Sequence, residues 1–374
     1  MKKILLIAFA AVLLVAFCAP AMAATKKVSF YGDIRFNTWW INKDSDYYAV
    51  NNSNTTNDSD SDLQWQMDPY DSRFGAKFSE GPISANVEIR PLSASVYRQW
   101  WGAWNMGWGT LLVGHTYVPL CLAIGYSNFD SESIVSYGSF MDRLRAEQIQ
   151  LTVPFGMGFV KLALVKPPTT EPDYTNGSIA NVDTDVKFPQ LEMCLNLNFS
   201  PVSIDLVGSY HTFDIVNATI DSKAESVTSY IYGGRIKFGM GPFYFKGLLV
   251  FGQNVGNGGE LTSAGLYYRK MLYDVGNDRS YDSDYTDYGG VLGFKVNDML
   301  TVEVGYFQQK TERYLKEKDK NGAYYIVFPF TPIKGFTIYP EIGVFDDKDV
   351  TDSAGNTTDE GKRTYFGAYW KISF

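Results

Sequence analysis

Apolar and polar residues alternate with a period of two along most of this chain. In the first such segment, one face carries Phe30, Ile34, Phe36 and Trp40, and the other carries Ser29, Asp33, Arg35 and Asn37. The same pattern returns at 83–90, 190–199, 202–209, 300–309 and 336–344. Because successive side chains of a strand point to opposite faces, these segments are predicted to be strands with one apolar face and one wet face.

The connections between the predicted strands alternate between short and long. Short turns include Glu80-Gly81-Pro82, Ser200-Pro201 and Asn297-Asp298. Longer polar stretches lie at 41–62, 116–142, 167–188, 212–226, 254–285, 310–322 and 346–362. A membrane-crossing strand must satisfy its backbone through neighbouring strands, so we predict an all-β fold, a closed antiparallel transmembrane β-barrel of about 16 strands with short periplasmic turns and long outer loops.

The first residues have the parts of a secretory signal peptide. Two lysines precede the apolar run 4–17, and a small-residue cleavage site follows at 21–23. We therefore predict a signal peptide at 1–23 and a single barrel domain at 24–374. Lipid attachment at Cys18 is an alternative, although the residue before it is too large for the known lipobox.

Composition narrows the function classes. The formal net charge is −8, and loss of the two lysines of the signal peptide makes the mature chain −10. This acidity argues against nucleic acid as a partner. Cys121 and Cys194 are too few for a disulfide scaffold and are not spaced like metal ligands, although a single disulfide between them stays open. We therefore expect neither a cofactor nor a metal.

A transmembrane helix at 106–127 is the alternative to a barrel strand in that region. The stretch carries no formal charge if its histidine is neutral, and it is long enough to span a bilayer. It also contains Gly107, Gly109, Gly114 and Pro119, which make a poor helix. We therefore favour strands here as well.

The C-terminal segment RTYFGAYWKISF alternates most clearly, and one of its faces ends in Trp370, Ile372 and Phe374. It looks like the signal by which bacterial outer-membrane barrels are recognised for insertion. SRFGAKFSEG at 72–81 and WGTLLVGHTYVPL at 108–120 resemble segments of the general porins. The likeness covers the mature length and the order of strands.

This resemblance implies a barrel of about 16 strands that assembles as a homotrimer, with the third outer loop folded into the lumen as a constriction. The stretch 116–142 stands at the position of that loop. His115 departs from the family, because many relatives carry Arg there, and the constriction motif Pro-Glu-Phe-Gly-Gly is absent.

Basic residues on the wet faces of the first strands are candidates for the pore lining. Arg35, Arg73, Lys77 and Arg98 are predicted to form a ladder facing the loop residues Asp130, Glu132 and Asp142, with Arg143 and Arg145 at the end of the loop. Opposed charges across a narrow lumen create a transverse field that orients polar solutes. The alternative for each residue is a wall side chain that only stays hydrated and paired. His115 is also expected to line the pore.

Aromatic residues near the predicted strand ends fit the girdles of a membrane barrel. The tryptophans assigned to these girdles are Trp39, Trp40, Trp100, Trp101, Trp104, Trp108 and Trp370. The alternative is a track of lumen aromatics that binds sugars.

The sequence thus predicts an outer-membrane porin for passive diffusion of small hydrophilic solutes and ions. A channel specific for oligosaccharides or organic anions is the alternative, and an outer-membrane hydrolase is a third hypothesis with little support from two histidines. Expected partners are outer-membrane lipids, two further copies of the chain and the barrel assembly machinery. Acidic outer loops predict a weak preference for cations, which the basic ladder opposes.

Overall fold

A computed structural model describes residues 27–47, 60–68, 71–90, 97–129, 140–141, 145–177, 182–217, 225–258 and 266–374. The predicted signal peptide lies outside these ranges. Within them, no helix is both long and apolar enough to cross a membrane.

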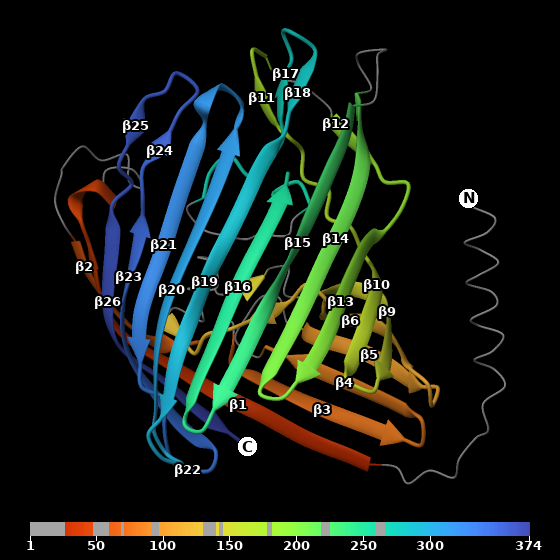
Figure 1. Ribbon diagram of the computed structural model, residues 1–374, viewed down its shortest axis with the longest axis vertical. Helices are drawn as coiled ribbons and strands as arrows, with labels where there is room; N and C mark the ends of the chain where they lie inside the picture. The colour runs from red at the N-terminus through yellow and green to blue at the C-terminus, as the bar shows by residue number, and fades with distance from the viewer. Residues whose placement is uncertain are drawn as a thin grey trace.

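The chain forms a closed antiparallel barrel of 16 strands (Figure 1). They are β1 (Lys27–Lys43), β2 (Asp60–Met67) continued by β3 (Arg73–Glu80), β4 (Ile83–Ile89), β5 (Tyr97–Asn105), β6 (Thr110–Tyr117), β9 (Arg145–Phe155), β10 (Gly158–Val165), β12 (Val182–Asp185) continued by β13 (Gln190–Phe199), β14 (Val202–Asn217), β15 (Glu225–Met240), β16 (Phe243–Gln253), β19 (Ser283–Lys295), β20 (Thr301–Arg313), β21 (Lys318–Val327) continued by β22 (Phe330–Ile333), β23 (Phe336–Asp347) and β26 (Lys362–Ser373).

The first and last strands close the ring. One edge of β1 pairs with β26, from Asp33 opposite Ser373 to Lys43 opposite Arg363. Its other edge pairs with β3 and then with β2. Closure satisfies the backbone of β1 on both sides, as a strand in lipid requires.

Small elements decorate the end of the barrel that carries the long connections. β11 (Asp173–Thr175), β17 (Leu272–Asp274) and β18 (Arg279–Tyr281) form a three-stranded sheet there, and β24 (Val350–Thr351) pairs with β25 (Thr357–Thr358) (Figure 1). β7 (Leu122–Ala123) and β8 (Phe140–Met141) pair within the loop after β6. Tight turns join strands at the opposite end, and Gly81 adopts φ 56° in one of them, a conformation that favours glycine. By the usual asymmetry of these barrels, the decorated end is the outer one.

The side chains of the barrel strands alternate between the outer and inner faces as the sequence predicts. On β13, Leu191 and Met193 are exposed on the outside, while Glu192 and Asn196 are buried inside. The tryptophan prediction holds only in part: Trp40, Trp100, Trp108 and Trp370 are exposed, but Trp39 is fully buried in the lumen. Trp101 also faces inward, where its Nε1 donates to Gln99.

Two predicted outer loops are mostly strand. β14 extends to Asn217 and β15 begins at Glu225, so little of 212–226 is left as a connection. β20 and β21 are joined only by residues 314–317, which include the 3₁₀ turn η2 (Tyr314–Lys316). These strands continue beyond the lipid, where polar residues on both faces are tolerated and the apolar alternation is lost.

The barrel wall is uneven in height. β14 and β15 have 16 residues each, whereas β3 and β4 have 8 and 7. A tilted strand needs roughly 9 to 11 residues to cross the hydrocarbon core. β4 is shorter than this, β3 reaches it only together with β2, and β14 and β15 project beyond the membrane.

Candidate functional site in the lumen

The lumen contains the first part of the loop between β6 and β9. Residues 118–129, here called the inner belt, contact inward-facing residues of successive strands. These contacts join Leu120 to Glu192 of β13, Ala123 to Arg235 of β15, Ile124 to Lys246 of β16, Tyr126 to Glu303 of β20 and Asn128 to Glu341 of β23. The described part of the predicted constriction loop therefore lies inside the barrel and follows its wall.

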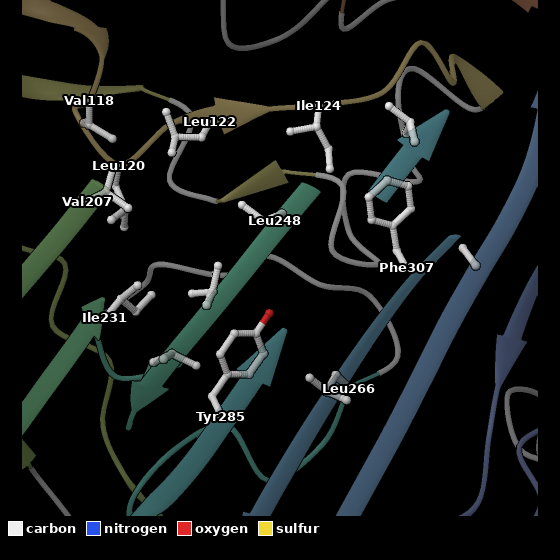
Figure 2. Close-up of a cluster of buried hydrophobic side chains, with 14 of the residues drawn as sticks. Val118, Leu120, Leu122, Ile124, Val207, Ile231, Leu248, Leu266, Tyr285 and Phe307 are labelled. Atoms are coloured by element: carbon white, nitrogen blue, oxygen red, sulfur yellow. The ribbon is translucent and has the colours of Figure 1, made fainter. Parts of the chain in front are cut away.

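Between these polar contacts the inner belt presents apolar side chains to the wall. Val118, Leu120, Leu122 and Ile124 are each at most 5% exposed. They belong to one buried cluster with wall residues that include Val207, Ile231 and Leu248 (Figure 2). Burial of this apolar surface favours the packed position of the belt.

Glu303 and Glu341 are the principal acceptors for the belt. Each accepts hydrogen bonds from belt residues and from tyrosines of neighbouring strands. Glu303 accepts from the Tyr126 N–H (2.6 Å) and from the hydroxyls of Tyr325 (2.7 Å) and Tyr244 (2.8 Å); Glu341 accepts from the Ser127 hydroxyl (2.5 Å), the Asn128 N–H (2.9 Å) and the Tyr365 hydroxyl (2.6 Å). Buried acceptors with several donors are held in fixed positions, which also fixes the belt.

Two glycines make room for these tyrosines. Tyr325 lies opposite Gly305 and Tyr365 lies opposite Gly343. A Cβ at either glycine would come within 2.3 or 2.4 Å of the tyrosine ring or hydroxyl. Each ring therefore lies flat on the neighbouring strand.

The end of the belt is fixed by aromatic contacts. Phe129 stacks on Tyr365 with ring centroids 3.8 Å apart and packs edge-on against Trp39 at 5.4 Å. All three rings are at most 2% exposed. Offset and edge-to-face pairs of this kind add to the apolar burial.

The opposite side of the lumen carries the predicted basic ladder. Arg98 binds Asp71 at 2.6 Å and Glu88 at 2.9 Å. Arg35 donates to Asp33 at 3.0 Å and to the Tyr369 hydroxyl at 3.1 Å.

The other ladder residues differ in their partners. Arg73 lies 3.3 Å from Asp33 and 3.9 Å from Glu88. Lys77 is exposed and lies 5.1 Å from the centroid of the Tyr31 ring. The structure thus brings the four predicted ladder residues onto one wall, but three of them are paired with acids of that wall.

The ladder continues into a larger basic wall. Arg145 donates to the Tyr117 hydroxyl at 3.1 Å, and Arg98 donates to the same oxygen at 3.3 Å. Nε of Arg90 makes no hydrogen bond among the described residues. The basic wall comprises Arg35, Arg73, Lys77, Arg90, Arg98, Arg145 and Lys371, together with the acids Asp33, Asp68, Asp71 and Glu88. Seven cations and four acids leave this wall with a net charge of +3.

The predicted loop acids cannot be placed against this wall. Asp130, Glu132, Asp142 and Arg143 lie outside the described residues, so their facing the ladder stays a prediction. The acids that pair with the arginines are instead Asp33, Asp71 and Glu88. Sequence reasoning missed Asp71, because it lies in the break between β2 and β3, where no alternation marks its direction.

A second connection also packs inside the mouth, and no sequence pattern indicated it. Leu266 is buried in the same cluster as the belt. The N–H of Tyr267 donates to Asp319, and Thr311 donates to the Tyr267 carbonyl at 2.7 Å. Arg313 donates to the Lys270 carbonyl at 3.1 Å. The connection between β16 and β19 therefore narrows the lumen above the belt.

His115 does not line the pore as predicted. It lies opposite Trp100 and Glu147, on the outward face that also carries the exposed Val113 and Ile149. Its Nδ1 is 3.9 Å from Glu147. The period of two identified the two faces of β6, but near the strand end it did not show which one is wet.

The C-terminal residues face outward. Trp370, Ile372 and Phe374 are 36, 49 and 66% exposed. Phe374 exchanges two backbone hydrogen bonds of 3.0 Å with Gly32. The predicted assembly signal is thus an apolar outer stripe on the strand that closes the barrel.

The two cysteines of the barrel are free thiols, Cys121 on the belt and Cys194 on β13. Within the described ranges, no group of three or more His, Cys, Asp or Glu side chains is arranged to hold a metal. The chemistry of the lumen is therefore that of charges and hydrogen bonds on a wet wall.

A closed barrel with an internal loop and a charged wall defines a membrane channel. The sequence matches the family model described as Gram-negative porin over residues 10–350. The chain belongs to this family and forms an outer-membrane channel for passive diffusion of small hydrophilic solutes. The family consists of channels rather than enzymes. No curated protein matches the sequence.

Solved structures share the fold at low identity. The outer-membrane channel DcaP of Acinetobacter baumannii is 14% identical with a TM-score of 0.67, over 93% of this chain and 97% of that one. The trimer form of OmpT from Vibrio cholerae is 13% identical with a TM-score of 0.59, over 94 and 100%. An anion-selective porin from Comamonas acidovorans is 15% identical with a TM-score of 0.56, over 94 and 100%.

Proposed function

We propose that this porin prefers small anions, and that the basic wall selects them where the inner belt narrows the lumen. The observation that carries this proposal is the net charge of +3 on the basic wall. Lys77 makes no ion pair among the described residues, and Arg145 binds a tyrosine rather than an acid. These cations are available to passing solutes.

The belt opposite contributes no opposing charge, because residues 118–129 contain no Asp, Glu, Lys or Arg. Arg235 and Lys246 donate to its carbonyls, and Arg235 is paired with Asp205 at 2.7 Å. The preference for cations expected from the outer loops rests on distant acids, which salt screens beyond roughly 10 Å. Charges at the narrow level act on every solute that passes. Similarity to a porin described as anion-selective is consistent with this sign.

A reversal potential in a KCl gradient tests the proposal. The wild-type channel should give the sign of an anion-selective pore, and the double variant R90Q/R145Q should shift it toward cations. The outward-facing pair K166Q/K187Q removes the same charge from outside the lumen and should leave the potential unchanged. A cation-selective wild-type channel would overturn the proposal.

A channel specific for an organic anion is the second candidate. It is favoured by the guanidinium groups of Arg90 and Arg145, which lie close enough to each other and to Tyr117 to interact electrostatically. Block of the open channel by micromolar carboxylate or phosphate solutes would identify specificity. Ohmic conductance without block would identify general diffusion.

We also propose the remaining features of assembly. Membership of the family supports cleavage of residues 1–23, insertion through the barrel assembly machinery, contact with outer-membrane lipids and association as a homotrimer. The trimer form of the similar outer-membrane protein OmpT from Vibrio cholerae supports the homotrimer. The lumen roles of Arg35, Arg73, Lys77, Arg98, Asp130, Glu132, Asp142, Arg143 and Arg145 belong to this proposal.

Deletion of Phe374 tests the assembly signal. The variant should give less heat-modifiable, membrane-inserted protein, because it shortens the apolar outer stripe and removes the hydrogen bonds to Gly32. Channels that do assemble should conduct normally, since Phe374 points away from the lumen. A normal yield of inserted protein would count against the assignment.

A further inference from the structure

Three Asn-Gly steps occur in the chain, at 176–177, 257–258 and 321–322. Asparagine followed by glycine is the step at which a polypeptide loses ammonia most readily. The reason is steric: glycine has no Cβ, so its amide nitrogen can approach the side-chain carbonyl carbon of the asparagine. The three steps therefore share the same chemistry, and the fold decides which of them can react.

Two of these steps are fixed inside the structure. Asn257 is fully buried; its Nδ2 donates to the Thr170 carbonyl at 2.9 Å, and its Oδ1 accepts from the Met271 N–H at 2.7 Å. Asn321 is also fully buried, in β21, where β20 and β23 pair with it on both sides. Reaction at either residue requires the surrounding structure to open first.

The third step lies at the edge of the three-stranded sheet of β11, β17 and β18, here called the outer sheet (Figure 1). Asn176 directly follows β11, and both Asn176 and Gly177 are exposed. The chain leaves the sheet here, with φ 53° at Asn176 and 146° at Gly177. Neither the Asn176 carbonyl nor the Gly177 N–H makes a backbone hydrogen bond among the described residues. The peptide between them can therefore rotate without breaking a backbone hydrogen bond.

The side chain of Asn176 is held only at its nitrogen, where Nδ2 donates to Oδ2 of Asp274 at 3.1 Å. Asp274 also accepts from Nδ2 of Asn277 at 2.7 Å and from the N–H groups of Gly276 and Asn277 at 3.1 Å. These hydrogen bonds, first that from the Asn277 side chain, lower the pKa of Asp274. Asp274 is therefore a carboxylate at neutral pH.

We propose that Asn176 is a site of spontaneous deamidation, which alters the outer end of the channel over time and leaves the barrel unchanged. The Gly177 nitrogen attacks Cγ of Asn176, the bond from Cγ to Nδ2 breaks, and Nδ2 leaves as ammonia with the proton of the Gly177 amide. Water then opens the cyclic imide at either carbonyl. One product is aspartate at position 176, and the other is isoaspartate, in which the main chain runs through the side-chain carbons.

Both products carry a negative charge where Asn176 carried a hydrogen-bond donor. The new carboxylate faces that of Asp274, and two adjacent like charges repel each other. β11 is attached to the outer sheet close by, since the Val275 N–H donates to the Thr175 carbonyl at 3.0 Å. The reaction should therefore loosen β11 from β17.

Peptide mapping by mass spectrometry of the folded protein in detergent, incubated at mildly alkaline pH, tests this inference. Conversion of amide to carboxylate at Asn176 should be at least about tenfold faster than at Asn257 and Asn321, where reaction waits for local opening. In denaturant the three steps should react at similar rates, because the fold no longer protects two of them.

Asn356 is the matched control that lacks the glycine. It is exposed, and its Nδ2 donates to Asp352 at 2.9 Å, but Thr357 follows it and the side chain of Thr357 hinders the attack. Asn356 should therefore stay unreacted over the time in which Asn176 is converted. Equal conversion of Asn356 and Asn176 would show that exposure alone sets the rate, and would overturn the assignment to the Asn-Gly step.

The variant N176D supplies one product directly and tests its effect on the outer sheet. Hydrogen exchange of the Val275 N–H should be faster in N176D than in the wild-type protein. N356D places the same charge beside Asp352 in another outer turn and should leave exchange at Val275 unchanged. Heat-modifiability verifies that the barrel of each variant is folded.

Three further results would overturn the proposal. Equal rates at the three Asn-Gly steps of the folded protein would show that the fold does not select among them. Reaction of Asn176 in denaturant but not in the folded protein would show that its contact with Asp274 protects it. Unchanged exchange at Val275 in N176D would show that the new charge does not loosen β11.

Discussion

The two sides of the lumen use acidic residues in different ways. On the basic wall, Asp71 and Glu88 neutralise arginines, and an excess of cations remains. On the opposite side, Glu303 and Glu341 accept hydrogen bonds from neutral donors of the inner belt and from wall tyrosines. Under the proposed function, the first arrangement sets the field in the pore, and the second sets the position of the loop that narrows it. Selectivity and pore size are therefore open to separate change.

Shortening the loop between Tyr126 and Ser139 should have the largest effect. The variant loses the contacts of Phe129 and Asn128 and removes material from the lumen, so single-channel conductance should rise and bulkier solutes should enter. The basic wall is untouched, so selectivity should keep its sign. Unchanged conductance and solute cutoff in a folded barrel would show that this part of the loop does not restrict the pore.

Arg98→Gln should act mainly on stability. Arg98 is 3% exposed and compensates both Asp71 and Glu88, and removing one partner of a buried ion pair costs about 3 to 5 kcal/mol. The temperature at which the folded barrel converts to the unfolded band on gels should fall. Lys77→Gln is the control on the same wall, because this exposed lysine should change selectivity with little loss of stability. Equal stability of the two variants would contradict the pairing described here.

The alternating sequence predicts which of these residues face the lumen, but it does not predict their hydrogen-bond partners. The period of two placed Arg35, Glu303 and Glu341 on the wet face correctly. It does not say that Glu341 accepts from Asn128, because that contact joins positions 213 residues apart. It also fails at irregularities: the register shift beside Glu88 lets both Arg98 and Gln99 face inward. Strand existence is encoded locally, whereas the loop position depends on packing against distant strands.

Gly343→Ala should loosen the belt without changing any charge. A methyl group would lie 2.4 Å from the Tyr365 hydroxyl, so the ring must move away from Glu341 and Phe129. Overpacking of this kind costs about 1 to 3 kcal/mol. We expect more frequent brief current fluctuations in single-channel records. Gly102→Ala is the matched control, because the nearest atom there is 4.0 Å away. Identical noise in both variants would mean that Tyr365 does not fix the belt.

The smallest expected effect is a pH dependence of the local stability of the connection between β16 and β19, which packs inside the mouth of the barrel. Glu360 lies between β25 and β26 and is 4% exposed. Burial, and then the charges of Asp319 and Asp347, raise its pKa to about 8. A carboxyl whose pKa is raised by folding stabilises the folded state fully below its unfolded pKa, and this contribution is lost as the pH rises through the folded pKa. Between roughly pH 4.5 and 8, local stability should therefore fall.

Hydrogen exchange in residues 266–271 measures this opening, because the Tyr267 N–H donates to Asp319 beside Glu360. Protection should decrease from pH 5 to pH 9 after correction for the intrinsic exchange rate. Glu360→Gln should weaken the decrease, and the neighbouring Asp319, hydrogen-bonded to Glu360, carries the rest. Asp352→Asn is the control. Hydrogen bonds from Asn356 lower the pKa of Asp352, so its contribution is lost only as the pH falls into the acid range. Its variant should keep the decrease between pH 5 and 9. Protection that does not change with pH in the wild-type protein would show that ionisation of Glu360 does not open this connection. In that case the charges of the lumen would act on solutes without changing the position of the chain.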